Sequence, residues 1–506
     1  MAPANTMQKS ITISKSIVNS SVVNTAFTSD IVIGLEIHVQ LDTESKLFCG
    51  CATQPTKKQV EQGQDIPNSR TCEVCLGMPG SKPVFNEKVL AYALKLCLAL
   101  NCEIAPELIF SRKSYFYPDL AKNYQITQYE KPLGSNGFLT LPTGKKVGVT
   151  RVHIEEDPAS LVHPGGNLAN ASSASSVLID YNRSGIPLCE IVTNPAMTSP
   201  EEARAFMKKL ITILHYLGIF DEKNSVIKAD ANISIKKSGY IRSEVKNVTG
   251  FKEIERALFY EVGRQQKAVD SGERLVLDTR GWDPNKGLTF RMRTKETEAD
   301  YGYILDTDLV AIDVTQDLLT QIKHEMPELA DAKITKYTDQ HGISKLDAEV
   351  LAQEKKLAEL FEKVSKKVDP LLAAKWLRRE LVRVMNYNKQ TFDDLLIDET
   401  HMIELLDLIE KKVITEQVAQ KLLEQLIIKP FSPKAYVQKQ GLGALSDNKQ
   451  IEKICKEVIA ENPGVVQEYK KGNEKSFHFL IGQVMRKTQG KATPKDVNEM
   501  MKKLLK

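Results

Sequence analysis

The sequence predicts an α+β protein in which a mixed α/β domain is followed by an all-α domain and a small all-α module. Residues 30 to 314 alternate strand-like runs with helical patterns, whereas the residues after about 315 show helical patterns alone. A chain of 506 residues is also too long for one hydrophobic core and fits about three domains. The predicted divisions are an N-terminal extension at 1–29 and domains at 30–314, 315–428 and 429–506.

The first predicted strand carries the first candidate site residues. Apolar residues alternate from Ile31 to Leu41, and a period of two indicates a half-buried strand. Glu36, His38 and Gln40 therefore share the other face of this strand. Further strands are predicted at 146–154, 176–181, 188–193 and 227–235, and helices at 86–100 and 199–217.

Four of the eight cysteines form two close pairs, Cys49 with Cys51 and Cys72 with Cys75, separated by twenty residues. Two such pairs on separate turns can place four thiolates around one Zn²⁺. The segment between them has too few large apolar residues to order itself, so a metal would organise it. Redox pairs or scattered thiols are the alternative. A site closed by four cysteines would be structural, and the chemistry must lie elsewhere.

The compartment is indicated by the other cysteines and by the first residues. Cys97, Cys102, Cys189 and Cys455 are isolated in mostly apolar surroundings, which suits a reducing compartment better than a disulfide framework. No apolar run reaches the ~18 residues of a membrane span. Residues 1–29 contain two Lys and no acid, which fits a transit peptide or a disordered extension. We therefore expect a cytoplasmic protein, or one of an organelle matrix if the extension is a transit peptide.

Charge is distributed unevenly along the chain. The net charge is +4, but residues 429–506 contain sixteen Lys and Arg against eight Asp and Glu, so the remainder is slightly acidic. A basic terminal module on an acidic body is typical of a nucleic-acid anchor. A solubilising surface is the alternative. The two-proline segment at 429–434, which precedes these helices, is predicted to be a linker.

Several acids and one histidine lie on strand-like segments. Glu36 and His38 share one face, Glu155 and Glu156 end a second strand, and Glu190 lies in an apolar run. A carboxylate in such a run is costly unless it is paired or metal-bound. Carboxylates with an imidazole suit Mg²⁺ or Mn²⁺, with substrate phosphates at the open positions. The structural alternative is that these acids form salt bridges with Arg112, Arg151 or Arg183.

Three other segments are rich in polar groups, at 111–119, 180–185 and 244–247. Lys113, in the first of them, could steer a small nucleophile or hold a phosphate, although a solvated loop lysine is the commoner case. Asn and Arg in the other two could bind phosphate or acid groups. The chain has no Walker-type loop, no G-x-S-x-G motif and no Ser/Lys amidase cluster.

These segments resemble the GatB/GatE family, the B subunits of glutamyl-tRNA(Gln)/aspartyl-tRNA(Asn) amidotransferases. The similar runs are IGLEIHVQ (33–40), CLGMPG (75–80), RKSYFYPD (112–119), HIEED (153–157), DYNRSGIPLCEIVT (180–193) and EVKN (244–247). Near the C-terminus, FLIGQVMR (479–486) and QGKA (489–492) resemble the family's tail domain. The resemblance extends from about Asp30 to the end of the chain.

The resemblance implies a cradle domain with the active site, a helical domain and a tail similar to the YqeY family. It implies a heterotrimeric ligase in which the amidase subunit GatA releases ammonia, with GatC as the small subunit. The family's own polypeptide would use ATP and Mg²⁺ to activate the carboxylate of mischarged Glu-tRNA(Gln) or Asp-tRNA(Asn) as an acyl phosphate. Ammonia would then give Gln-tRNA(Gln) or Asn-tRNA(Asn). The zinc cluster also occurs in many family members.

The resemblance also implies roles for individual residues. Lys113, Glu155 and Glu190 would be catalytic, with Lys113 on the ammonia route. Mg²⁺ would be held by Glu36, His38, Glu155, Glu156 and Glu190, with only one of Glu155 and Glu156 required. Substrate would be bound by Arg112, Tyr115, Tyr117, Asn182, Arg183, Lys246 and Asn247. The tRNA would be bound by Lys475, Arg486, Lys487 and Lys491.

Two positions depart from the family pattern. The run NSVIK (224–228) stands where the family commonly has an acidic-Gly-Ser-Leu-Arg type of sequence, which places Lys228 at its end. The run DYGYILDTD (300–308) stands where the family has D-Y-R-Y-F-P-E-P-D, so Gly302 replaces an arginine. These changes raise the alternative of an RNA-binding subunit that has lost catalysis. A kinase or ligase acting alone would not explain the tail.

Overall fold

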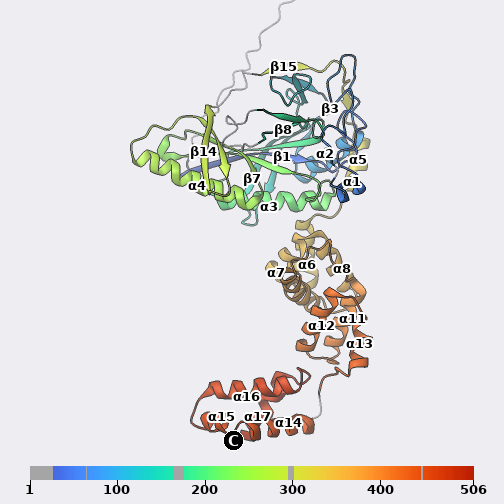
Figure 1. Ribbon diagram of the computed structural model, residues 1–506, viewed down its shortest axis with the longest axis vertical. Coiled ribbons are helices and arrows are strands. Elements are labelled where there is room, and N and C mark those ends of the chain that lie inside the picture. The colour runs from blue at the N-terminus through green and yellow to red at the C-terminus, as the bar shows by residue number, and fades with distance from the viewer. Residues whose placement is uncertain (1–26, 64, 165–175, 295–300, 446–447, 506) are drawn as a thin grey trace, which may run out of the picture.

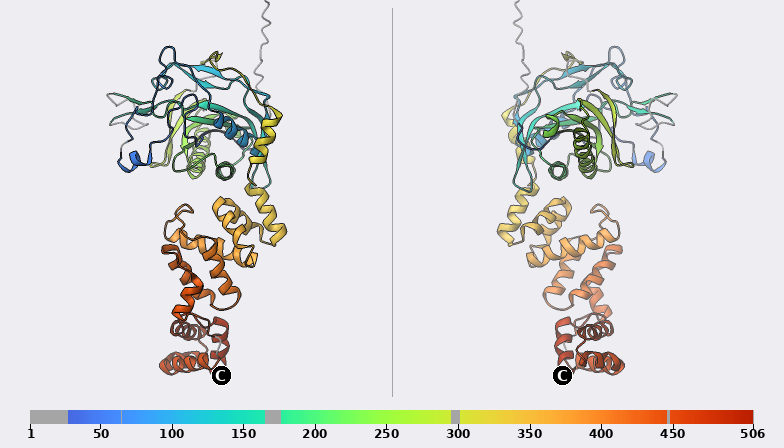
Figure 2. Two further views of the ribbon diagram at one scale, coloured as in Figure 1. Left: turned by 90° about the vertical axis from the view of Figure 1, so that its right-hand side faces the viewer. Right: turned by 90° about the vertical axis from the view of Figure 1, so that its left-hand side faces the viewer.

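The computed structural model describes residues 27 to 505, except 64, 165–175, 295–300 and 446–447. Most of the predicted extension at 1–29 lies outside these residues. The described chain has three hydrophobic cores, which follow one another along its length. Figures 1 and 2 show three bodies stacked along the long axis, with the sheet-bearing body at one end and the C-terminal helices at the other.

A nine-stranded sheet forms the first body, in the order β14-β13-β12-β11-β1-β10-β7-β6-β2. Strand β1 is central, and the pairing is antiparallel except between β12 and β13. The strands are β1 (Ile31–Gln40), β2 (Glu103–Ile104), β6 (Gly134–Thr140), β7 (Lys146–Glu156), β10 (Pro187–Thr193), β11 (Ile227–Ile235), β12 (Ser243–Thr249), β13 (Asp278–Asp283) and β14 (Leu288–Thr294).

The two faces of the sheet differ in what covers them. Ile33, Ile37 and Val39 of β1 are fully buried in a core shared with helices α2 (Glu87–Ala99), α3 (Pro200–Leu217) and α4 (Phe251–Asp270). Helices α3 and α4 lie side by side below the sheet in Figure 1. The alternation of β1 therefore directs Glu36 and His38 away from these helices. The predicted strand at 31–41 is confirmed with its two faces.

Short strands and a short helix complete the first body. They are β3 (Glu107–Leu108), β4 (Ser111–Ser114), β5 (Tyr124–Thr127), β8 (Ser160–Val162), β9 (Leu178–Asp180), β15 (Gly302–Leu305), β16 (Ile312–Asp313) and α1 (Lys57–Glu61). The short strands form three small sheets, β15-β4-β5, β16-β3 and β8-β9. In Figure 1 the β15-β4-β5 sheet lies on the side of the large sheet opposite α3 and α4.

The boundaries of helix α3 follow from its sequence. The hydroxyl of Ser199 accepts a hydrogen bond from the Glu202 amide at 3.3 Å, and Pro200 occupies the first turn, where its missing N–H costs nothing. Gly218 ends the helix in the left-handed conformation, with φ of 66°. The other predicted strands and helices of this body are also present, with ends shifted by no more than two residues.

Helices alone follow, as predicted. The first of them, α5 (Gln316–Glu325), still packs on the first core through Ile322. The second core contains α6 (Ala330–His341), α7 (Lys345–Gln353), α8 (Lys355–Val364), α9 (Pro370–Lys375), a π-helical turn at Trp376–Leu381, α10 (Val382–Tyr387), α11 (Glu399–Glu410), α12 (Glu416–Ile428) and α13 (Pro433–Gln440).

The third core is formed by α14 (Asn448–Glu461), α15 (Pro463–Lys470), α16 (Glu474–Lys487) and α17 (Pro494–Leu505). Val437 of α13 and the neighbouring Phe431 pack in the second core. The two-proline segment at 429–434 therefore connects two helices of one core, which corrects its interpretation as a linker between domains. Among the described residues, no helix combines the length and the apolar character needed to cross a membrane.

Candidate active site and metal centres

Strand order brings the candidate acids together. Because β1 lies between β10 and β11, His38 is opposite both Glu190 of β10 and Lys228 of β11. Glu36 is opposite Asp230 on β11. Strand β7 pairs with the far side of β10 and places His153 opposite Glu190. Residues more than a hundred positions apart in the chain thus share one face of four adjacent strands.

The first cluster consists of His38, Glu155 and Glu190, whose ligand atoms lie within 4.8 Å of one another. The His38 Nε2 atom is 3.5 Å from the Glu155 carboxylate and 3.4 Å from that of Glu190. Both carboxylates are buried, whereas 28% of the His38 side chain is exposed. This is an imidazole and two carboxylates around one point that opens to solvent, which fits a divalent cation.

The charges in the first cluster determine its protonation. Burial alone would lower the pKa of His38, but a hydrogen bond to Glu190 and the charge of Glu155 raise it to about 9. Burial alone would raise the pKa of Glu190, but His153, His38 and Arg151 bring it well below its usual range. Glu190 is therefore a carboxylate, and His38 is the group whose proton a metal would displace.

His153 was not among the predicted site residues. Its buried Nε2 atom lies 3.5 Å from the Glu190 carboxylate and 3.8 Å from that of Glu155. Arg151 approaches the other oxygen of Glu190 at 3.6 Å. The only sequence signal for His153 was its place two residues before Glu155, on the same face of β7. The arrangement supports a positioning role for His153 toward the two carboxylates.

The second cluster consists of Glu36, Asp230 and Glu244, again with ligand atoms within 4.8 Å of one another. Lys246 contacts the Asp230 carboxylate at 2.7 Å and that of Glu244 at 3.2 Å. Burial alone would lower the pKa of Lys246, but Asp230 and Glu244 raise it above its ordinary value. Lys246 therefore remains a cation and offsets part of the negative charge.

Asp230 and Glu244 were missed from the sequence. Glu244 opens the polar segment at 244–247, but the nearness of Asp230 and Glu244 to Glu36 depends on the pairing of β1, β11 and β12. Two hydrogen bonds orient the cluster. The Asn232 amide donates to Glu36 at 3.1 Å, and the Thr279 hydroxyl donates to Glu244 at 3.3 Å.

The single metal site expected from the sequence is thus divided between two clusters. Glu36 lies in the second cluster rather than beside His38. Glu156 lies in neither, because its carboxylate accepts the Ile126 amide at 2.8 Å and pairs with Lys122 at 2.6 Å. Adjacent residues of a strand point in different directions, so Glu155 alone reaches His38.

Lys113 lies on β4, among aromatic rings. Its Nζ atom is 4.8 Å from the centre of the Tyr301 ring, and Tyr115 packs edge-on against the same ring. Tyr115 itself is half-buried, while Tyr117 is 54% exposed. Burial, followed by the charges of Asp119 and Glu155, raises the pKa of the Tyr115 hydroxyl. Strand β4 pairs with β5, whose Thr127 hydroxyl donates to the Glu155 carboxylate at 3.4 Å, so this segment lies near the first cluster.

Three predicted substrate-binding side chains are engaged within the protein. Arg112 pairs with Asp306 at 2.8 Å and Asp308 at 2.9 Å. Arg183 donates to the carbonyl oxygens of residues 158 and 159. The Asn182 side chain accepts from the Arg70 amide at 2.8 Å and donates to the carbonyl of residue 66. The alternative in which the candidate acids pair with arginine holds for Glu190, whose carboxylate lies 3.6 Å from Arg151.

The structure also places Asn247, the remaining predicted binding residue, and the two departures from the family pattern, Lys228 and Gly302. The backbone of Asn247 continues β12, but its side chain lies outside the described part. Lys228 lies beside His38 on β11, and its charge acts on Asp157. A Cβ at Gly302 would make only ordinary contact with Ser114 at 3.7 Å. Packing therefore does not require glycine at 302.

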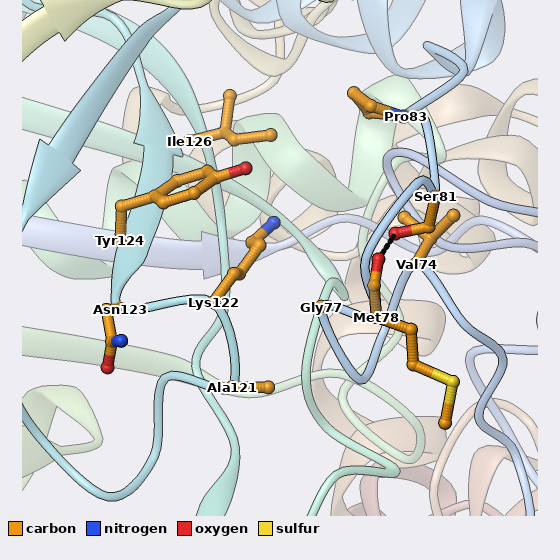
Figure 3. A pocket seen from close by; sticks show the side chains of 10 residues that line it. All are labelled: Val74, Gly77, Met78, Ser81, Pro83, Ala121, Lys122, Asn123, Tyr124 and Ile126. Atoms are coloured by element: carbon orange, nitrogen blue, oxygen red, sulfur yellow. Dashed lines mark hydrogen bonds between the residues drawn. The ribbon is translucent and has the colours of Figure 1, made fainter.

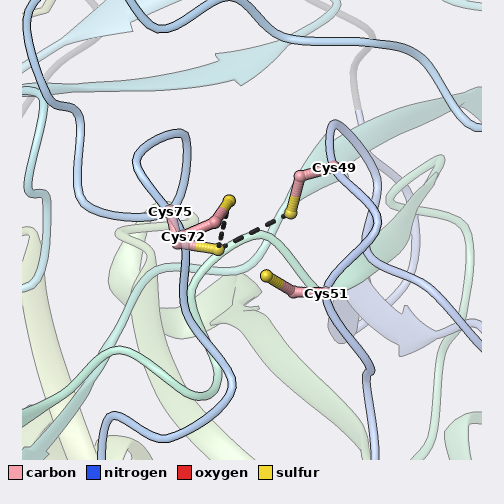
Figure 4. Close-up of side chains that lie close together, drawn as sticks. All are labelled: Cys49, Cys51, Cys72 and Cys75. Atoms are coloured by element: carbon pink, nitrogen blue, oxygen red, sulfur yellow. Dashed lines mark hydrogen bonds between the residues drawn. The ribbon is translucent and has the colours of Figure 1, made fainter.

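The four predicted zinc ligands lie together, as Figure 4 shows. The Sγ atoms of Cys49 and Cys72 are 3.6 Å and 3.8 Å from that of Cys75. Tetrahedral Zn²⁺ with Zn–S bonds of about 2.3 Å separates its sulfurs by about 3.8 Å, so the cluster fits this ion. The Cys49 thiol lowers the pKa of Cys75 to about 4, against the effect of burial and with help from Lys46.

We call residues 49–80, which contain the four cysteines, the zinc segment. A polar cavity of about 280 Å³ lies between this segment and β5. Figure 3 shows Lys122 and Tyr124 facing Gly77 and Met78 across it. Gly77 has φ of 61°, and a Cβ there would lie only 2.8 Å from the Lys122 side chain. Glycine is therefore required at position 77, where the zinc segment approaches Lys122, the ion-pair partner of Glu156.

The predicted tRNA-binding residues of the tail differ in their surroundings. Lys475 and Arg486 are exposed on α16, eleven residues apart and hence on one face, with the exposed Phe479 between them. Lys487 pairs with Glu461 at 2.5 Å and Glu457 at 3.7 Å. Lys491 follows the helix and is half-exposed.

Comparison with known proteins gives consistent matches. Residues 31–320 match the family described as the GatB/GatE catalytic domain, and residues 359–505 match the one described as the GatB domain. Similar proteins in three bacteria are named as the B subunit of aspartyl/glutamyl-tRNA(Asn/Gln) amidotransferase. That of Carboxydothermus hydrogenoformans is 40% identical over 93% of this chain and 98% of its own length. Those of Thermodesulfovibrio yellowstonii and Geotalea daltonii are 42% and 43% identical, over 94% of this chain and 99% and 98% of theirs.

Proposed function

Since this chain belongs to the GatB/GatE family of tRNA amidotransferases, we propose that it amidates the carboxylate of mischarged Glu-tRNA(Gln), Asp-tRNA(Asn) or both. The observation that carries the proposal is the first cluster, His38, Glu155 and Glu190, on the central strands of the matched catalytic domain. Side chains of this kind suit phosphoryl chemistry with a divalent ion. The RNA-binding alternative gives no reason to bury two carboxylates around a histidine.

The chemistry assigned to this site is activation of the tRNA-borne carboxylate by ATP. That carboxylate attacks the γ-phosphorus of ATP, ADP leaves, and the acyl phosphate is then open to ammonia, which expels phosphate and leaves the amide. His38, Glu155 and Glu190 would hold Mg²⁺, which when bound offsets phosphate charge and orients the transferred group. The His153 and Arg151 side chains keep Glu190 ionised and aimed at the site.

The first cluster is the better candidate for the principal ion. In the second cluster Lys246 already offsets part of the charge of Asp230 and Glu244, which lowers the electrostatic gain from a bound cation. In the first cluster Arg151 offsets part of the charge of Glu190, but it lies 3.6 Å away and 40% of its side chain is exposed, so it offsets less than Lys246 does. We assign the second cluster, with Lys246, to the nucleotide side of the same reaction.

Ammonia would be supplied by another chain. This sequence contains no amidase nucleophile motif, so an amidase subunit, GatA, and the small subunit GatC complete the enzyme. Lys113 is proposed to line the ammonia route. What supports this is its position among Tyr115 and Tyr301 beside the first cluster, where a polar and aromatic lining would pass a small amine.

Zinc and tRNA would be bound away from the chemistry. The four cysteines would hold a structural Zn²⁺, since their sulfurs have the spacing of a tetrahedral site. The third core would bind tRNA through phosphates, as its excess of Lys and Arg favours. We place the enzyme in the cytoplasm, or in an organelle matrix if residues 1–29 are a transit peptide.

Reconstitution with GatA and GatC tests the proposal. The complex is given glutamine, ATP and Mg²⁺, and each mischarged tRNA in turn. Formation of Gln-tRNA(Gln) or Asn-tRNA(Asn) is the expected result, and the comparison of the two also identifies the preferred substrate. Glutamine hydrolysis without amidation of either tRNA would favour the RNA-binding alternative.

A further inference from the structure

Lys46 is a lysine whose side chain is completely buried, with a relative exposure of 0%. It follows β1 closely in the chain, and its ammonium reaches into the zinc segment. The Nζ atom donates to the carbonyl oxygens of Arg70 at 2.8 Å and Tyr181 at 3.2 Å. Its third contact is the Sγ atom of Cys75, at 3.4 Å. The three donors of the ammonium thus have three acceptors.

A buried ammonium needs a compensating negative charge. Burying an isolated charge is strongly unfavourable, and carbonyl oxygens compensate only part of this cost. Among the described residues, Lys46 has no ion pair with a carboxylate. Of the three groups that its ammonium contacts, only the Cys75 sulfur can carry a negative charge, as a thiolate. A cysteine cluster with net negative charge would therefore supply the compensation that the buried ammonium of Lys46 needs.

A zinc-loaded cluster provides that charge. Four thiolates around one Zn²⁺ carry a net charge of −2, and one ammonium reduces it to −1. A hydrogen bond from nitrogen to a metal-bound thiolate also stabilises the ligand, as outer partners of metal sites commonly do. Zinc and Lys46 thus stabilise each other within one buried unit.

The same lysine connects the zinc segment to the strand that carries Glu190. The turn at 181–185 begins with the Tyr181 carbonyl that Lys46 contacts and ends shortly before β10. The Leu47 amide donates to the Gly185 carbonyl at 2.8 Å, and a Cβ placed at Gly185 would lie 3.6 Å from the Lys46 side chain. From the zinc segment, the Arg70 amide donates to Asn182 at 2.8 Å.

We propose that Lys46 is the charge-balancing cation of the zinc site and that it couples zinc binding to the order of the turn at 181–185. The turn is held from two sides, by the backbone after β1 and by the zinc segment. Lys46 bonds both to Cys75 of the cysteine cluster and to the turn. Zinc occupancy then positions the start of β10, and with it Glu190. This inference rests on the proposed zinc site.

Zinc affinity tests the first half of the proposal. Full-length wild-type protein and the variants K46M, K46R and K57M are titrated with a competing chelator, and bound Zn²⁺ is measured. Methionine keeps the length of the side chain without its donors or charge, and Lys57 is an exposed lysine of the same segment. We expect K46M to bind zinc at least about tenfold more weakly than wild type. K46R should lose less zinc affinity than K46M, and K57M should bind zinc like wild type.

The outcomes separate the inference from its premise. Equal zinc affinity of K46M and wild type overturns the role of Lys46 while leaving the zinc site intact. Wild-type protein that binds no zinc instead removes the zinc site on which the inference rests. The Co²⁺-substituted proteins give a second readout, because the sulfur-to-cobalt charge-transfer band should shift in K46M and stay fixed in K57M.

Hydrogen exchange on wild-type protein tests the coupling and does not depend on the folding of a variant. The Ser184 amide donates to Tyr181 at 3.1 Å and the Gly185 amide to Asp157 at 2.9 Å. Removal of zinc by chelation should speed exchange at both amides several-fold, while the amides of α16 exchange as before. Unchanged exchange at Ser184 and Gly185 after complete zinc removal would overturn the coupling.

Discussion

The Nε2 atom of His153 lies 3.5 Å from the Glu190 carboxylate, on the strand that pairs with β10. The same oxygen of Glu190 is 3.4 Å from His38 on the other side. One carboxylate thus stands between two imidazoles on neighbouring strands. His38 is partly exposed and available to an ion, whereas His153 is buried and holds Glu190 in place.

His153 is therefore expected to act on the metal through Glu190. His153→Gln should weaken Mn²⁺ binding by about 10- to 100-fold, the usual cost of losing an outer partner of a metal ligand. Binding is measured by electron paramagnetic resonance on the whole complex without ATP. In His153→Asn the side chain is too short to reach Glu190, so this variant should bind Mn²⁺ at least as weakly. Wild-type Mn²⁺ affinity in both variants would exclude this role.

Lys113→Ala should separate carboxylate activation from amide formation. If Lys113 lines the ammonia route, the variant should still cleave ATP in the presence of mischarged tRNA, while amidation falls by about 100-fold, the order of loss caused by a misplaced reactant. Both rates are measured in one reaction. An equal loss of ATP cleavage would instead place Lys113 at the phosphates.

Cys72→Ser should destabilise the first body without removing any acid of the two clusters. Losing one of four thiolates weakens zinc, and the binding free energy of a structural zinc contributes to folding. We expect less bound zinc by elemental analysis and a lower melting temperature. Cys455→Ser, in the third core, is the matched control, and its zinc content should equal that of wild type. Full zinc content in Cys72→Ser would argue against the four-cysteine site.

The tail offers a pair of adjacent cations with different surroundings. Arg486 is exposed beside Phe479, whereas Lys487 is already paired with Glu461 at 2.5 Å. Arg486→Ala should raise KM for charged tRNA and reduce the slope of log affinity against log salt by about one. Lys487→Ala should change KM and the salt slope less, because Glu461 already neutralises part of the Lys487 charge. Equal effects of the two substitutions would show that the ion pair does not govern tRNA binding.

Removal of residues 444–506 is a broader test of the tail. This cut leaves α13 in the second core, where Val437 is buried, whereas a cut at 432 would expose that core. The shortened enzyme should bind tRNA more weakly and lose most of the salt dependence, while the glutaminase activity of the complex persists. Unchanged tRNA affinity would show that the third core is not the anchor.

Local patterns predicted the parts of the site that lie within one strand or one loop. The alternation of β1 was sufficient to place Glu36 and His38 on one face, and the spacing of the cysteines was sufficient to group them. The residues and the family resemblance both singled out Glu155 and Glu190, and the structure brings the two carboxylates together at His38.

Relations across strands could not be predicted in the same way. Glu36 meets Asp230 because β11 pairs with β1, and no local pattern encodes that register. Glu155 and Glu156 are both buried at the end of β7, so burial does not distinguish them, and only the contacts with Lys122 and His38 do. The neutralisation of Lys487 by Glu461 likewise depends on the packing of α14 against α16.

The central claim is that the cluster of His38, Glu155 and Glu190 activates the tRNA-borne carboxylate with ATP. The most direct test withholds ammonia and measures ADP and hydroxylamine-trapped acyl phosphate in the reconstituted complex with mischarged tRNA. Wild type and Glu156→Gln, whose carboxylate lies outside both clusters, should both form the trapped product. Glu190→Gln, which removes the charge of a metal ligand, should lose it by at least about 100-fold, whereas its glutamine hydrolysis, measured in a separate reaction with glutamine, should continue. Trapped acyl phosphate at the wild-type level in Glu190→Gln would contradict the account.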